Sequence, residues 1–176
     1  MSAALLMANL QANLRGQYAL ALEDIPRLLR SVNRLFYKNT ENNHYATTFF
    51  AVYDDESRRL RYVNCGHNPP LLARADGRVE QLGATATVLG LFEEWDCSVA
   101  ELELAVGDVL VIYTDGISEA SPNEEDEFGE QRLIDATRSH RQRSADEILE
   151  AIISEVQEFS QGEQADDMTL IVARGR

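Results

Sequence analysis

The sequence has no apolar run long enough to cross a membrane. A membrane-spanning helix needs about 20 consecutive apolar residues, and the 176-residue chain contains no such stretch. The apolar segment at residues 3–8 has no basic leader and is followed by the polar residues Asn9 and Gln11, so it is unlike a secretory signal. We therefore expect a soluble protein of the cytoplasm.

Cysteine is scarce as well. The two cysteines, Cys65 and Cys97, lie in separate strand-like segments and lack the spacing of a redox or zinc motif. A disulfide-stabilised scaffold would need many more cysteines. Both residues are expected to be buried free thiols.

Basic residues are few in the second half of the chain. Residues 1–90 carry ten basic and eight acidic side chains, whereas residues 91–176 carry six basic and twenty-two acidic ones. A negative field of this kind repels nucleic acids and anionic membranes, and it favours cations or basic partner surfaces. We interpret the acidic run at residues 124–127 as a solvated loop that contributes to solubility.

The composition, 44% hydrophobic and 26% charged, is typical of one globular domain, here residues 1–176. Periodicity and capping patterns predict helices at residues 2–17, 25–38, 130–140 and 145–160. Strands are predicted at residues 47–53, 60–65, 71–74, 79–82, 98–104, 109–113 and 168–172. We expect the first helix to be buried. We also expect turns to join the two strands in each of three consecutive pairs, 47–53 with 60–65, 71–74 with 79–82 and 98–104 with 109–113. The fold class is therefore α+β with mainly antiparallel strands.

Two acidic segments stand at opposite ends of two predicted strands. Asp115 follows the apolar run 110–113, whereas Asp166 and Asp167 precede the run 168–172. If these strands are antiparallel neighbours, the three carboxylates meet at one edge of the sheet. Clustered carboxylates need a counter-charge, and hard divalent cations such as Mg²⁺ or Mn²⁺ select oxygen ligands. Taken separately, each acid is more often an ordinary turn or loop residue.

An ordered series of motifs extends over nearly the whole chain. It comprises Tyr45-Ala46-Thr47-Thr48-Phe49-Phe50, Asn64-Cys65-Gly66-His67-Asn68-Pro69-Pro70-Leu71, Leu89-Gly90-Leu91, Gly107-Asp108, Asp115-Gly116-Ile117-Ser118-Glu119-Ala120, Phe128-Gly129 and Asp166-Asp167-Met168-Thr169-Leu170. In this order the motifs resemble the metal-dependent protein phosphatases (PPM family), in particular the bacterial branch similar to stage II sporulation protein E.

The resemblance implies an antiparallel β-sandwich flanked by helices and a hydrolase that removes phosphate from phosphoserine or phosphothreonine. By resemblance, Asp115 and Asp166 bind metal, with Asp167 as a further candidate, and two Mn²⁺ or Mg²⁺ ions activate water without a covalent phosphoenzyme. The implied substrate is a phosphorylated anti-sigma-factor antagonist, so the implied role is signal transduction in sigma factor regulation. Relatives carry an upstream sensor or receiver domain, which would act at residues 2–17 and 25–38.

The sequence departs from the family pattern at its start. The family's Asp-x-x-Gly-(His or Lys)-Gly segment, whose Asp bridges the metals, is absent, and we expect the domain to be N-terminally incomplete and to lack the family's first strands. Weak metal binding, little phosphatase activity and self-association as a homodimer are expected consequences. The alternative from another class is a non-catalytic, phosphatase-like interaction module. A soluble α+β domain with incidental acids ranks last.

Three further residues are assigned structural roles. His67, between Gly66 and two prolines, is expected to order a tight connection rather than to act in catalysis. Tyr113 and Trp95 are expected to be packing aromatics.

Overall fold

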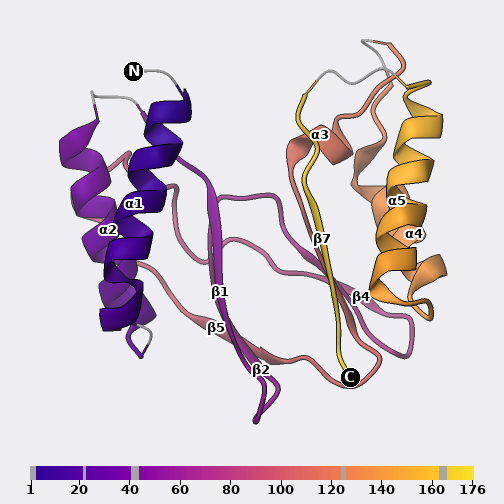
Figure 1. The fold of residues 1–176 in the computed structure, drawn as a ribbon, viewed down its shortest axis with the longest axis horizontal. Coiled ribbons are helices and arrows are strands. Elements are labelled where there is room, and N and C mark those ends of the chain that lie inside the picture. Colours follow the sequence, from indigo (N-terminus) through magenta and orange to yellow (C-terminus); the bar gives the residue numbers. More distant parts are fainter. Residues whose placement is uncertain (1–2, 22, 41–43, 124–125, 163–165) are drawn as a thin grey trace. The chain divides into compact units, whose positions relative to one another are not determined.

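The computed structural model describes residues 3–21, 23–40, 44–123, 126–162 and 166–176. These residues form two compact units, residues 1–67 with 84–102 and residues 68–83 with 103–176. Each unit has its own sheet and its own helices (Figure 1). Within the described residues, no helix combines the length and the apolar character that a membrane span requires.

The first unit contains two helices and a three-stranded sheet. The helices are α1 (Ala3–Ala21) and α2 (Ile25–Asn39), and the strands β1 (Thr48–Asp54), β2 (Arg59–Cys65) and β5 (Ala100–Glu103) lie in the order β1-β2-β5. The predicted pairing of β1 with β2 is confirmed, in register from Thr48 with Cys65 to Asp54 with Arg59. The Asp54 carboxylate accepts the amides of Glu56 and Ser57, which closes the turn between the strands.

Helix α2 follows its predicted pattern closely. Asp24 caps it by accepting the Arg27 amide at 2.9 Å, and Pro26 stands in the first turn, where its missing N–H is not needed. The apolar stripe packs into the core of this unit, except for Leu35, which is 37% exposed. The buried members are Ile25, Leu28, Leu29, Val32 and Phe36.

One buried polar residue of α2 holds the Leu89-Gly90-Leu91 motif. The Asn33 side chain accepts the Gly90 amide at 2.8 Å and donates to the Phe92 carbonyl at 2.9 Å. Gly90 has φ +87°, and a Cβ there would lie 2.4 Å from the Phe36 ring. The motif is therefore a packing site where only glycine fits.

Helix α1 differs from the prediction in length and in burial. It continues past Gly16 to Ala21, because one glycine costs a helix only about 1 kcal/mol and good helix formers follow it. Leu10 is buried and Leu6 and Leu14 are partly buried against the core, whereas Leu5 and Met7 are each 60% exposed. The expectation that the whole helix is buried was wrong, since a single stripe makes the contact.

The second unit packs helices on a four-stranded antiparallel sheet of order β4-β3-β6-β7. The strands are β3 (Leu71–Ala73), β4 (Val79–Gln81), β6 (Val109–Tyr113) and β7 (Leu170–Arg174). The helices are α3 (Asp115–Ser118), α4 (Gly129–His140) and α5 (Ala145–Phe159). Figure 1 shows α4 and α5 side by side, and both contact the sheet. A capping box opens α5, with Ser144 and Glu147 bonded reciprocally.

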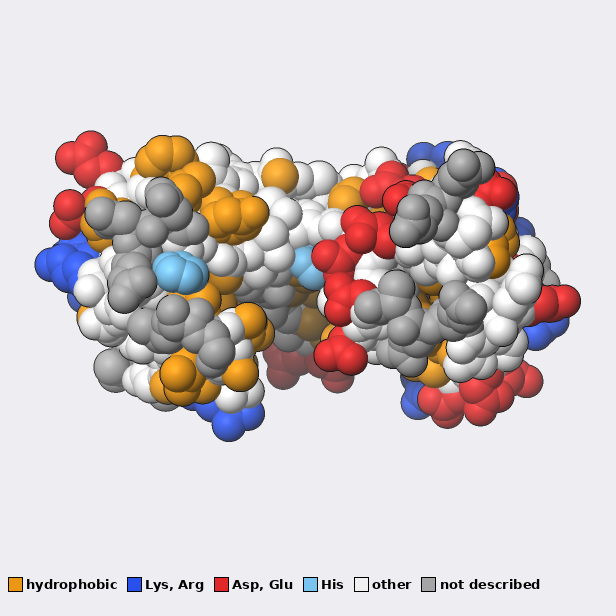
Figure 2. Space-filling model, turned by 90° about the horizontal axis from the view of Figure 1, so that it is seen from above, with side chains coloured by type: hydrophobic (Ala, Val, Ile, Leu, Met, Phe, Trp, Pro, Cys, Tyr) orange, Lys and Arg blue, Asp and Glu red, His pale blue; other side chains and the backbone are white. Residues whose placement is uncertain are grey.

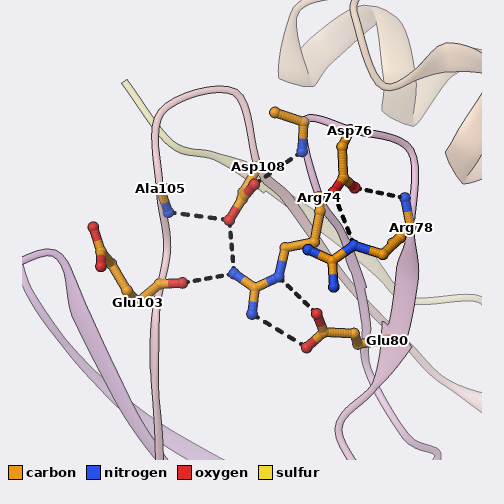
Figure 3. Close-up of polar contacts among 8 residues, drawn as sticks. Arg74, Asp76, Arg78, Glu80, Glu103, Ala105 and Asp108 are labelled. Carbon is orange, nitrogen blue, oxygen red and sulfur yellow. Dashed lines mark hydrogen bonds and ion pairs between the residues drawn. The ribbon is translucent and has the colours of Figure 1, made fainter.

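The predicted hairpin of residues 98–104 with 109–113 was wrong. Strand β5 lies in the first sheet beside β2, whereas β6 pairs with β3 and β7 in the second sheet. The reason is the buried Asp108, whose carboxylate accepts the amides of Ala75 and Ala105 and the Arg74 guanidinium at 2.8–3.1 Å (Figure 3). Gly107-Asp108 therefore anchors the start of β6 to the end of β3 and does not close a hairpin.

Arg74 extends this anchor to the neighbouring strand. Its guanidinium donates two hydrogen bonds to the Glu80 carboxylate, at 2.9 and 3.1 Å, and one to the Glu103 carbonyl at 2.9 Å (Figure 3). The hydrogen bonds with Glu80, and after them those with Asp108, raise the pKa of Arg74 above its ordinary value. The arginine therefore stays charged opposite the buried Asp108.

We predict that Asp108→Asn lowers the free energy of unfolding by roughly 2–4 kcal/mol, because it removes the buried one of the two carboxylates that pair with Arg74 and weakens the hydrogen bonds that this carboxylate accepts. Chemical denaturation would measure the change. The matched control is Asp76→Asn, which alters the exposed ion pair with Arg78 and should have a smaller effect. Equal stabilities of Asp108→Asn and the wild type would contradict the anchoring role.

Candidate metal centre

Strands β6 and β7 bring the two acidic segments together. They are antiparallel neighbours, with Val109 opposite Arg174 and Tyr113 opposite Leu170. The end of β6 therefore lies beside the start of β7, and Asp115 and Asp166-Asp167 extend from the same edge of the sheet. The predicted antiparallel arrangement is confirmed.

Asp115 opens a short helical turn at this edge. Thr114 is still extended, with φ −94° and ψ 164°, and Asp115 is the first residue of α3. The Asp115 Oδ1 atom accepts the amide of Gly116 at 3.0 Å. The acid is solvent-exposed, while the three residues that follow it are buried.

Gly116 is where the two acidic segments touch. A Cβ at this position would lie 2.5 Å from the Asp167 carbonyl oxygen and 3.0 Å from the Asp167 carbonyl carbon. Real Cβ atoms do not approach backbone so closely, so the segments can pack in this way only if residue 116 is glycine. The sequence alone suggests only a turn at Asp115-Gly116. It did not reveal that the contact with Asp167 requires a glycine at position 116.

Asp166 and Asp167 form a compact pair before β7. The Asp166 Oδ1 atom accepts the amide of Asp167 at 2.7 Å, and both side chains are exposed. In the parts of the chain that the structure describes, no three His, Cys, Asp or Glu side chains gather in a group suited to holding a metal ion. The structure thus brings the two acidic segments together, and the roles of Asp115, Asp166 and Asp167 as metal ligands remain predictions.

The donor chemistry nevertheless fits a hard divalent cation. Mg²⁺ usually keeps several waters and is bound through one or two carboxylates, which two touching acidic segments can supply. Figure 2, viewed from the side on which α3 lies, shows Asp and Glu side chains gathered on this unit. Besides the three candidate ligands, the exposed acids in segments 115–127 and 166–169 include Glu119, Asp126 and Glu127. Glu124 and Glu125 of the acidic run lie outside the described residues.

The structural role expected for His67 agrees with its contacts. The buried Asn64 side chain accepts the His67 amide at 2.8 Å and donates to the His67 carbonyl at 3.1 Å. These bonds hold the backbone of the Gly66-His67 connection after β2. The Asn64 side chain therefore helps to fix the shape of this motif.

The two aromatic residues pack as predicted. Trp95 is 8% exposed and donates its indole N–H to the Thr87 carbonyl at 3.0 Å. Tyr113 is 1% exposed, and burial raises the pKa of its phenol above the ordinary value. Neither residue is needed to explain the metal centre.

Both cysteines are free thiols. Cys65 is fully buried, and burial raises its pKa to about 12. Cys97 is only partly buried, so the expectation of a buried thiol is confirmed for Cys65 alone. Cys65 belongs to the hydrophobic core of the first unit.

Comparison with known proteins identifies the family. The family model for stage II sporulation protein E (SpoIIE) matches residues 1–176. The chain belongs to the SpoIIE family. Its mixed helix and antiparallel-sheet fold matches the solved structures of PPM phosphatases, as the motif series indicated.

The curated relatives of this SpoIIE family member include a phosphoserine phosphatase. Over 153 residues it is 29% identical to the phosphoserine phosphatase RsbU of Bacillus subtilis, covering 84% of the chain and 44% of RsbU. Over 128 residues it is 32% identical to the protein IcfG of Synechocystis, covering 72% of the chain and 20% of IcfG. The chain thus spans less than half the length of these relatives.

Solved structures of similar fold cover nearly the whole chain. The RsbU and RsbW domains of a Mycobacterium tuberculosis protein match with a TM-score of 0.81 and 26% identity, over 99% of this chain and 48% of that one. The SiaA-PP2C domain of Pseudomonas aeruginosa matches with a TM-score of 0.82 and 21% identity, over 98% of this chain and 70% of that one. At the latter identity, the likeness shows the fold alone.

We predict that Gly116→Ala separates the two acidic segments, because the added methyl group collides with the backbone of Asp167. The substitution should lower the free energy of unfolding by roughly 1–3 kcal/mol and weaken Mn²⁺ binding, measured by thermal unfolding and calorimetric titration. The matched control is Gly16→Ala in α1, where an added Cβ meets nothing within 4 Å. That variant should be as stable as the wild type or more so. Unchanged stability and Mn²⁺ binding in Gly116→Ala would contradict the close contact.

Proposed function

We propose that this SpoIIE family member is a Mn²⁺- or Mg²⁺-dependent protein serine/threonine phosphatase. The observation that supports the proposal is the backbone contact, at one sheet edge, between the segment of Asp115 and the segment of Asp166 and Asp167. The name of RsbU, phosphoserine phosphatase, supports the reaction class. The catalytic domain of the phosphatase PstP, solved with two manganese ions, shares the fold with a TM-score of 0.65.

Asp115 and Asp166 would hold the cation, with Asp167 as the further candidate. When bound, such a cation lowers the pKa of water and neutralises the oxygens around phosphorus. The chain's own contribution is to fix carboxylates on two segments in backbone contact. A phosphate group approaching these exposed acids would be repelled without a counter-ion, so the cation is also needed for substrate binding.

The substrate we propose is a phosphorylated protein of the anti-sigma-factor antagonist type. The resemblance of the motif series implies this class, and the name of RsbU, phosphoserine phosphatase, supports a phosphorylated serine as the target. An acidic protein with this surface would also favour a substrate with basic residues near the phosphorylated side chain. A further sensor or receiver domain, self-association as a homodimer and a cytoplasmic location belong to the same proposal.

We predict that Asp115→Asn weakens Mn²⁺ binding at least about tenfold, because it replaces an anionic ligand by a neutral one. Calorimetric titration would measure binding, and phosphate release from a phosphoserine protein would measure turnover, which should be slow and should require Asp115. The matched control is Asp55→Asn, an exposed acid in the turn between β1 and β2. Its Mn²⁺ affinity and turnover should equal those of the wild type.

Two outcomes would count against the enzyme. Equal Mn²⁺ binding by the wild type and Asp115→Asn would contradict Asp115 as a ligand. Mn²⁺ binding without phosphate release from any phosphoserine protein would favour the non-catalytic interaction module.

A further inference from the structure

We propose that Thr114 is a positioning residue of the metal centre. Its side-chain hydroxyl, in addition to its backbone amide, holds the segment of Asp166 and Asp167 against the segment of Asp115. The inference rests on the proposed function, since it concerns the same pair of acidic segments.

The ladder between β6 and β7 ends in an unusual way at Thr114. In a hydrogen-bonded antiparallel pair, two opposite residues exchange two backbone hydrogen bonds. The Thr114 amide donates to the Thr169 carbonyl at 3.1 Å, which is one of these bonds. The Thr114 carbonyl, however, accepts the amide of Ile117 at 3.0 Å and so begins the turn of α3. It is thus committed to α3 rather than to the second bond of the pair.

The hydroxyl of Thr114 takes the place of that carbonyl. The Thr169 amide donates to Thr114 Oγ1 at 3.0 Å, and the same hydroxyl donates to the Asp167 carbonyl at 3.3 Å. Threonine commonly caps a helix with its side chain at this position. Here the Thr114 side chain makes no cap hydrogen bond to α3. Its polar contacts are therefore directed across to the other acidic segment.

The position of this hydroxyl connects it to the metal centre. Thr114 directly precedes Asp115, and its two cross-strand partners stand on either side of Met168. On the other side of Asp115, Gly116 packs on the Asp167 backbone. Asp115 is thus bracketed by two contacts to the segment that carries the remaining acids. Residues that orient ligands in this way typically change metal affinity roughly 10–100-fold when substituted.

Thr114→Val and Thr114→Ser separate the hydroxyl from the shape of the side chain. Valine keeps the β-branched shape and the backbone bond to Thr169 but removes both hydrogen bonds of the hydroxyl, whereas serine keeps the hydroxyl. Because Thr114 makes no cap bond, valine removes no capping interaction from α3. The full 176-residue chain should be used for both variants.

Two readouts test the proposal. Hydrogen exchange of the Thr169 amide, followed by nuclear magnetic resonance without metal, should accelerate about five- to tenfold in Thr114→Val and stay near wild type in Thr114→Ser. Mn²⁺ affinity, from the electron paramagnetic resonance signal of free Mn²⁺, should fall about tenfold in Thr114→Val and be restored in Thr114→Ser. A role in stability alone would lower the unfolding temperature of Thr114→Val without changing its Mn²⁺ affinity while folded.

The outcomes distinguish this inference from the proposed function. Equal amide exchange in all three proteins would overturn the role of the hydroxyl, whatever the metal does. Faster exchange with unchanged Mn²⁺ affinity would overturn positioning of the metal centre. A wild type that binds no Mn²⁺ would contradict the proposed function itself, and positioning of a metal by Thr114 would fall with it. Amide exchange would then still show whether the hydroxyl holds the segment.

Discussion

The antiparallel pairing of β6 with β7 is the constraint on which the candidate metal centre depends. The two strands are separated by more than fifty residues of sequence, yet their register places Tyr113 opposite Leu170. The register decides which residues lie opposite each other and where the strand ends meet. A slip of even one residue would therefore move Asp115 relative to Asp166 and Asp167. The chemistry of the site therefore depends on a backbone arrangement.

Several contacts fix this register at both ends of the strand pair. At the start of β6, the buried Asp108 is bonded to Ala75, Ala105 and Arg74, and its carbonyl accepts the Gly175 amide at 2.9 Å. At the far end, Thr114 and Gly116 contact residues 167–169. Helix α5 packs against β7 from one side. A rigid second unit is the expected result, with exposed acids where the strands end.

Local sequence rules predicted the elements whose signals are local. The starts of α2 and α5 carry local signals in the sequence, the cap at Asp24 and the capping box at Ser144, and residues 54–57 carry the signal of the turn in the first hairpin. That the two acidic segments lie at the same sheet edge was also predictable, because their placement at opposite strand ends needs only the assumption of antiparallel neighbours. Such signals depend on a few adjacent residues, and they survive in the folded chain.

Features that depend on distant partners were not predictable in this way. The alternation in residues 98–104 indicates a strand but not its neighbour, and Asp108 directs the next strand into another sheet. The composition of α1 suggests burial, but burial depends on what lies beside the helix. The sequence around Gly116 indicates only a turn, whereas the structure shows that the Asp167 carbonyl packs against this glycine. Each of these is a tertiary contact that composition and periodicity do not encode.

The most direct measurement of the central claim is paramagnetic broadening of backbone amide signals by substoichiometric Mn²⁺ in the full chain. Broadening centred on residues 115–119 and 166–169 is the predicted result, since both segments would surround one cation. Broadening centred on other acids, such as Glu93 and Glu94, or no localised broadening, would contradict the account.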